Sequence, residues 1–279
     1  MTVHASPFVA SNPIVMPSRL DAFCAANTFD QPTLVIDVDR VEAQYRALAA
    51  GLGRASIHYA MKANPADEII ARLVALGSHF DAASKAEIAL CLSHGADPAH
   101  VSFGNTIKRS SDIAWAHAQG ITLFSADADE ELEKIAQNAP GAQVYIRLIV
   151  EVSQADWPLS RKFGCDRDTA IHLLGYAKLL GLDPVGFSFH VGSQTRQAAM
   201  WAPSLDALAD IWDAAKDAGY DLTLLNIGGG FPAFYGEAIE APTAYATDVM
   251  AQVTARFGDV ATIMAEPGRG LVAEAGVIV

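Results

Sequence analysis

Short apolar runs alternate along this chain with segments of helical spacing, and this alternation restricts the fold more than any other feature. The runs lie at 56–61, 78–82, 101–104, 121–125, 143–150, 184–190, 223–227 and 261–266. The segments between them place apolar residues three or four positions apart, as Ile70, Leu73 and Val74 show. Strands separated by helices predict parallel strand pairing with helical crossovers.

The number of apolar runs favours a closed barrel. Eight parallel strands close a (β/α)8 barrel, and a span of about 210 residues fits its usual size. We therefore predict an α/β chain that folds as a (β/α)8 TIM-like barrel. An open doubly wound sheet has the same alternation and remains the alternative.

Two segments lie outside the eight repeats. Residues 1–40 contain the strand-like run PTLVIDVD, and residues 270–279 read GLVAEAGVIV, which predicts another strand leaving the barrel. We expect residues 41–269 to form the barrel and residues 270–279 to begin a further domain. An apolar strand as the last element suggests that the remainder of this domain is missing from the chain.

Composition and charge exclude several classes of protein. With 51% hydrophobic residues the chain can bury a large core, and its net charge of −13 argues against a nucleic-acid partner. No apolar stretch is long enough for a membrane span, and the N-terminus lacks the basic region of a signal peptide. The three cysteines are far apart and lack metal-ligand spacing, so we expect reduced thiols, no metal site and a cytoplasmic protein.

Polar residues stand where nearly every predicted strand ends, and the carboxyl ends of the strands are where barrels carry their chemistry. They are Lys62, Asp81, Asn105, Asp127 (or Ser125), Arg147, His190, Gly228–Gly230 and Glu266–Arg269. Lys62 in YAMKANP stands just before Asn64 and Pro65, which are typical of a helix N-cap and first helical position.

The last two strand ends predict a phosphate site. NIGGGFP removes three side chains in succession, so that backbone N–H groups can approach an anion closely. EPGRG adds Gly268 and the guanidinium of Arg269 on the neighbouring strand. Phosphate sites in barrels commonly use the loops after these two strands.

A lysine, a phosphate cradle and a carboxylate at one barrel mouth together suggest pyridoxal 5′-phosphate (PLP). Lys62 would bond to the aldehyde, Glu266 would face the pyridine nitrogen, and His190 could stack on the ring. Ser193 could donate to the phosphate. Glu87 has a structural alternative, because SKAE at 84–87 is a capping box that starts a helix.

Seven motifs, in order from about residue 33 to residue 279, carry a family resemblance. They are YAMKANP, FDAASKAEI, GNTIKR, IRLIV…SRKFG, FHVGSQ, NIGGGFP and AEPGRG. With them the chain resembles the fold type III PLP-dependent decarboxylases, the ornithine/diaminopimelate/arginine decarboxylase group. FDAASKAEI and GNTIKR resemble the ornithine decarboxylase branch more than the diaminopimelate branch.

The resemblance implies a set of site residues. Lys62, His190 and Glu266 match the catalytic positions. The cofactor-binding positions are Lys62, Asp81, Glu87, Arg147, His190, Ser193, Gly229, Gly230, Glu266, Gly268 and Arg269.

The resemblance also implies an activity and an assembly. The activity is decarboxylation of a basic amino acid, first L-ornithine to putrescine in polyamine biosynthesis, with L-lysine as second substrate. A C-terminal β-rich domain, packing with the N-terminal segment, would supply further groups to a homodimer with shared active sites. Three alternatives stay open: a diaminopimelate decarboxylase or racemase, a non-catalytic homologue that binds a regulatory protein, and a phosphate-binding barrel without PLP.

Overall fold

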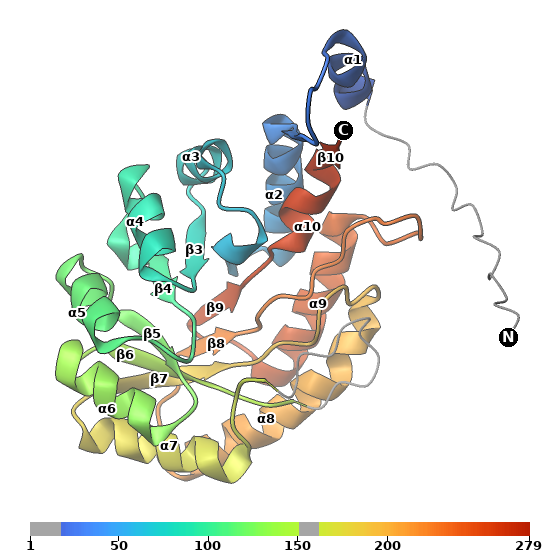
Figure 1. The fold of residues 1–279 in the computed structure, drawn as a ribbon. Helices are drawn as coiled ribbons and strands as arrows, with labels where there is room; N and C mark the ends of the chain where they lie inside the picture. The colour runs from blue at the N-terminus through green and yellow to red at the C-terminus, as the bar shows by residue number, and fades with distance from the viewer. Residues whose placement is uncertain (1–17, 151–161) are drawn as a thin grey trace, which may run out of the picture.

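The computed structural model describes residues 18–150 and 162–279, and its centre is a closed barrel of eight parallel strands (Figure 1). Each strand pairs with the next along the chain, and the last pairs with the first. The strands are β2 (Ser56–Ala60), β3 (His79–Ala82), β4 (Val101–Phe103), β5 (Leu123–Ala126), β6 (Gln143–Arg147), β7 (Asp183–Ser188), β8 (Leu224–Asn226) and β9 (Thr262–Ala265). The predicted (β/α)8 barrel is confirmed, and the open sheet is excluded.

Helices surround the barrel (Figure 1). The principal ones are α2 (Val38–Leu52), α3 (Asp67–Ala75), α4 (Lys85–Ser93), α5 (Ser110–Ala118), α6 (Asp129–Asn138), α7 (Arg167–Leu179), α8 (Ala202–Asp217) and α9 (Pro242–Phe257). Short 3₁₀ turns are η1 (Met61–Ala63), η2 (Pro98–His100), η3 (Ala198–Trp201) and η4 (Ala273–Ala275). Helix α2 packs against α9, so the helical layer closes as the barrel does.

Side-chain caps set several helix starts, and one predicted start is wrong. Asp166 accepts a hydrogen bond from the Thr169 N–H at 2.9 Å and so caps α7. The predicted start at Asn64 and Pro65 is two residues early, because the backbone is still extended at Asn64 and Ala66 and α3 begins at Asp67. Asn64 Oδ1 instead accepts from the Ala66 N–H at 3.1 Å.

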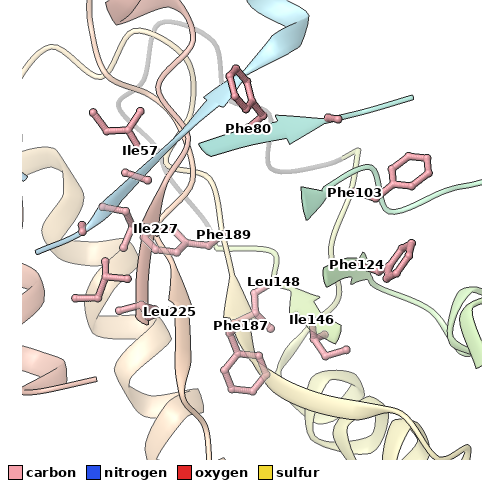
Figure 2. Packing of buried hydrophobic residues seen from close by; sticks show 14 of the residues in the cluster. Ile57, Phe80, Phe103, Phe124, Ile146, Leu148, Phe187, Phe189, Leu225 and Ile227 are labelled. Carbon is pink, nitrogen blue, oxygen red and sulfur yellow. The ribbon is translucent and has the colours of Figure 1, made fainter. Parts of the chain in front are cut away.

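The hydrophobic core lies mainly between the barrel and its helices. Figure 2 shows side chains such as Phe80, Phe124 and Phe187, which belong to one large cluster of buried residues. A much smaller apolar cluster consists of Tyr145, Val185, Leu224 and Met264. Along each strand, residues that face the helices alternate with residues that face the barrel interior, and many of the interior residues are polar.

The two ends of the described chain meet beside the barrel mouth. Strand β1 (Leu34–Ile36) pairs antiparallel with β10 (Gly276–Ile278) in a separate two-stranded sheet. The strand expected over 270–279 is therefore wrong in extent, since α10 (Arg269–Val272) and η4 precede β10. Helix α1 (Ser18–Ala26) was not expected from the sequence, and residues 1–17 of the N-terminal segment lie outside the described part. The domain boundaries at residues 40 and 270 remain predictions.

The part of the chain that the structure describes contains neither a membrane-spanning helix nor a cluster of metal-binding side chains. In residues 18–150 and 162–279 no helix is both long and apolar enough to cross a membrane. The same residues contain no group of three or more histidine, cysteine, aspartate or glutamate side chains placed to hold a metal ion.

Candidate active site

A cavity of about 530 Å³ lies at the carboxyl ends of the barrel strands, a volume that suits a small-molecule ligand. The β1–β10 sheet supplies an apolar wall through Leu34, Ile36 and Val277. The residues after β2, β7, β8 and β9 supply the polar wall, which contains Lys62, His190, Ser193, Gly229, Gly230, Glu266, Gly268 and Arg269. The fold thus brings together all of the predicted site residues except Asp81, Glu87 and Arg147.

Lys62 is positioned by the short turn that follows β2. The Tyr59 hydroxyl donates to the Asn64 carbonyl at 2.9 Å, and the Ala60 N–H donates to the Pro267 carbonyl at 3.2 Å. These bonds tie the turn to itself and to the loop after β9. The Lys62 side chain is exposed at the cavity, and none of the described residues pairs with its amine. Such an amine is available to bond to a carbonyl group.

The glycines of the cavity wall leave room that side chains would fill. A Cβ on Gly229 would lie 2.8 Å from the Glu266 carbonyl oxygen, and one on Gly230 would lie 2.7 Å from the Gly192 carbonyl oxygen. Gly230 also has a φ of +111°, which favours glycine. A Cβ on Gly268 would lie 2.9 Å from the Ala63 Cβ. Only glycine therefore lets the backbone form the wall here.

Arg269 places a guanidinium beside these glycines. Its Nη1 donates to the Tyr235 hydroxyl at 3.4 Å, and its Cζ lies 5.6 Å from the centre of the Tyr235 ring. Its Nε is buried and has no partner among the described residues. Tyr235 was not singled out from the sequence, because its loop carries no motif.

Glu266 is a buried carboxylate that lines the cavity. Its Oε1 accepts a hydrogen bond from Asn226 Nδ2 at 2.5 Å, and Asn226 Oδ1 accepts from the Gly228 N–H at 2.9 Å. The carboxylate is thus oriented by the strand next to its own. Asn226 was also missed from the sequence, although an amide at an inward position of an apolar strand was a usable signal.

His190 is neutral at the cavity. Burial, with the positive charges of Arg147 and Lys62, lowers the pKa of its imidazole to about 3. Its Nδ1 accepts a hydrogen bond from the Gly192 N–H at 2.9 Å, so its proton is on Nε2. The ring is therefore suited to stacking and not to carrying a charge.

The three remaining predicted residues lie away from the cavity wall. Asp81 is buried on β3, where burial and the nearby Glu266 raise the pKa of its carboxyl to about 7. Arg147 ends β6 and lowers that pKa, as Lys62 does. Glu87 Oε2 accepts from the Ala83 N–H at 2.6 Å, and the Glu87 N–H donates to Ser84 Oγ at 3.3 Å. These bonds belong to the structural alternative for Glu87, the start of helix α4.

PLP, which the sequence resemblance implies, fits this cavity. The space kept by Gly229, Gly230 and Gly268 suits a phosphate, and the unpartnered Arg269 Nε is a donor for one. The amine of Lys62 suits an aldehyde, and the carboxylate of Glu266 suits a protonated ring nitrogen.

Most of this chain is similar in sequence and in fold to known proteins. Residues 38–273 match the family described as "Pyridoxal-dependent decarboxylase, pyridoxal binding domain". The chain is 36% identical over 245 residues to a lysine/ornithine decarboxylase of Selenomonas ruminantium, and the match covers 88% of this chain but only 62% of the relative. It is 32% identical to antizyme inhibitor 2 of Xenopus laevis over 86% of this chain and 53% of that one. A solved lysine/ornithine decarboxylase of Vibrio vulnificus with cadaverine superposes with a TM-score of 0.85 at 29% identity, over 95% of this chain and 71% of that one.

Proposed function

Because this chain belongs to the pyridoxal-dependent decarboxylase family and contains its pyridoxal-binding domain, we propose that the whole protein decarboxylates a basic amino acid with PLP as cofactor. The main support for this proposal is the cavity. Its wall contains the amine of Lys62, the buried carboxylate of Glu266, and a phosphate site formed by glycines and Arg269. A PLP-dependent decarboxylase needs a lysine for the aldehyde, a carboxylate for the ring nitrogen and a site for the phosphate, all around one cofactor.

The residues of the chain have separate tasks in this proposal. When bound, PLP supplies an electron sink for the negative charge that departing CO2 leaves on the α-carbon. Lys62 would hold the cofactor covalently through its amine, which is the group that bonds to an aldehyde. Glu266 holds a proton at the ring nitrogen, and Asn226 orients the carboxylate for this. His190 covers one face of the ring as a neutral imidazole. Arg269 and the glycines bind the phosphate.

We place L-ornithine first among the substrates and L-lysine second. Support comes from the relative named a lysine/ornithine decarboxylase and from ornithine decarboxylases such as that of Rattus norvegicus, which is 33% identical over 244 residues. A diaminopimelate decarboxylase or a racemase would share Lys62 and the phosphate cradle. Incubation with a panel of amino acids, and detection of CO2, putrescine and cadaverine, separates these activities.

A non-catalytic binding protein is the second candidate, because one relative is named an antizyme inhibitor. Four residues argue against it. They are Lys62, His190, Glu266 and Arg269, all present in the cavity wall. A protein that has lost its chemistry can also lose such residues without penalty.

The proposal is tested by trapping the cofactor. Borohydride reduction of the protein with PLP is expected to abolish its visible absorption and to leave the pyridoxyl group on Lys62, as peptide mapping can show. Lys62→Ala is expected to take no label, and Lys85→Ala, a change on the outer helix α4, is expected to be labelled normally. A label on Lys108 or Lys162, or no label and no CO2 release from any amino acid, would reject the proposal.

We also propose that the protein is a cytoplasmic homodimer with shared active sites. The family resemblance is the support for the dimer, and the three free cysteines, Cys24, Cys91 and Cys165, are the support for a reducing compartment. Sedimentation of the purified protein and fractionation of cells test the two statements.

A further inference from the structure

The barrel interior beneath the cavity contains buried polar atoms that lack hydrogen-bond partners among the described residues. Five of them belong to strand residues: His58 Nδ1, Asp81 Oδ1, Ser125 Oγ, Tyr145 Oη and Ser188 Oγ. Buried polar atoms in proteins are usually satisfied, often by an ordered water. We therefore expect these five atoms to bind ordered water or one another.

Asp81 and Tyr145 face each other within this interior. A Cβ built on Gly104 would lie 1.8 Å from Asp81 Oδ1 and 3.1 Å from Tyr145 Oη. Asp81 Oδ1 therefore occupies the place that a Cβ of residue 104 would take, which is possible only because residue 104 is glycine, and Tyr145 Oη lies close to the same point. The two oxygens are near enough to share one water or to bond directly after a small rotation of a side chain.

The charge of Asp81 depends on its burial and on four charged groups around it. The charged groups that act on it come from four elements: Lys62 after β2, Glu87 on α4, Arg147 on β6 and Glu266 after β9. The two cations lower the pKa of the carboxyl, while burial and the two carboxylates raise it to about 7. Burial, together with Glu266 and Asp81, raises the pKa of Tyr145 well above its ordinary value, while Arg147 and the neighbouring Ser102 hydroxyl act in the opposite direction, so the Tyr145 hydroxyl keeps its proton. Tyr145 is thus a permanent donor beside a carboxyl that titrates near neutrality.

We propose that Tyr145 is a positioning residue whose hydroxyl donates a hydrogen bond to Asp81, directly or through one water, and keeps that carboxylate ionised beneath Lys62. A hydrogen bond to the charged form of a carboxyl favours that form. The ionised Asp81 then offsets the positive charges of Lys62 and Arg147, which act on it. This role concerns the charge of the barrel interior and does not depend on which amino acid is the substrate.

The test is a titration of Asp81 in the purified full-length protein, both with its cofactor and after the cofactor is removed. Carboxyl carbon NMR follows the group, and Asp81→Asn identifies its signal. Tyr145→Phe removes only the hydroxyl and is expected to raise the pKa of Asp81 by about one unit or more. The matched control is Tyr245→Phe, since Tyr245 is equally buried but bonds to Trp201 and Thr195. This control is expected to leave the pKa of Asp81 unchanged.

An unchanged pKa of Asp81 in Tyr145→Phe overturns the inference. If that variant does not fold, a high-resolution crystal structure of the unchanged protein decides. Tyr145 Oη and Asp81 must then bond to each other or to a common water, and separate partners overturn the inference. Both readouts are independent of turnover, so they can fail while the proposed decarboxylase activity stands, and the reverse also holds.

Discussion

At the scale of single residues, the site depends on groups whose charge is decided by their neighbours. His190 is neutral because burial and two cations oppose its protonation, while Asp81 titrates near neutrality because burial opposes its ionisation. Glu266 is buried against an amide donor, Asn226. A cofactor in this cavity would therefore meet a carboxyl group that Asn226 orients and the neutral ring of His190.

Replacing Glu266 by glutamine tests the role of that carboxylate. We expect Glu266→Gln to bind PLP but to turn over at least about 100-fold more slowly, because a neutral amide cannot favour a protonated pyridine. Cofactor content and the rate of CO2 release measure the two effects separately. Glu133→Gln, on the outer helix α6, is the control and should have ordinary turnover. Ordinary turnover in Glu266→Gln would mean that another group faces the ring nitrogen.

At the scale of elements, a buried ion pair joins the loop after β4 to helix α6. Lys108, between β4 and α5, has a fully buried side chain whose Nζ lies 2.9 Å from Glu131 Oε1 on α6. The same Nζ donates to the carbonyls of Asn105 at 2.8 Å and Ser125 at 2.6 Å. The Lys108 amine is therefore bonded to the loop after β4, to β5 and to α6, and it is not free to reach the cavity.

Breaking this pair on one side should be costly. Glu131→Leu leaves the Lys108 ammonium buried without its counter-ion, and we expect it to lower the free energy of unfolding by about 3–5 kcal/mol. The double change Lys108→Met with Glu131→Leu removes both charges and should recover most of that loss. Urea denaturation measures both values. Lys134→Met removes a partly exposed partner of Glu131 and should cost about 1 kcal/mol or less. A double variant as unstable as Glu131→Leu would contradict this account.

At the scale of the whole molecule, a stack of three histidine rings contains two, His58 and His79, whose lowered pKa values link stability to pH. His58, His79 and His100 come from β2, β3 and η2, near the amino ends of the strands and away from the cavity. The ring centres of His58 and His79 are 4.8 Å apart, and those of His79 and His100 are 3.9 Å apart. Burial lowers the pKa of His58 to about 3, with the neighbouring His79 adding to the effect.

The sign of the pH dependence follows from this lowered pKa. Below pH 6.5 the unfolded chain binds a proton at His58 that the folded protein does not bind, so stability is lost as the pH falls toward 3. The expected contribution of His58 is a loss of about 1.4 kcal/mol per pH unit. Unfolding free energies measured between pH 7 and pH 5 should thus change less steeply in His58→Gln than in the unchanged protein. His117→Gln on the outer helix α5 should retain the full slope, and equal slopes in all three proteins would contradict the assignment.

The sequence by itself was sufficient for the architecture and for most of the cavity wall. The alternation of apolar runs and helical segments predicts the barrel because parallel strands require helical crossovers, and glycines in succession predict a backbone cradle. Lys62, His190 and Glu266 can be predicted as site residues because they are polar residues at the ends of apolar strands. These patterns involve residues that are close together in the sequence, so they can be recognised before the tertiary contacts are known.

Only the tertiary structure decided which polar residues share a space. Asp81 lies on β3, Tyr145 lies on β6 and Gly104 follows β4, and Asn226 bonds to a residue 40 positions away, so no local pattern joins them. The start of α3 moved to Asp67 because the backbone is still extended at Asn64 and Ala66. The closing strand shortened to Gly276–Ile278 because α10 and η4 take up residues 269–275. Sequence determines the elements through nearest neighbours, whereas charge, burial and pairing in the site depend on contacts that exist only after the barrel has closed.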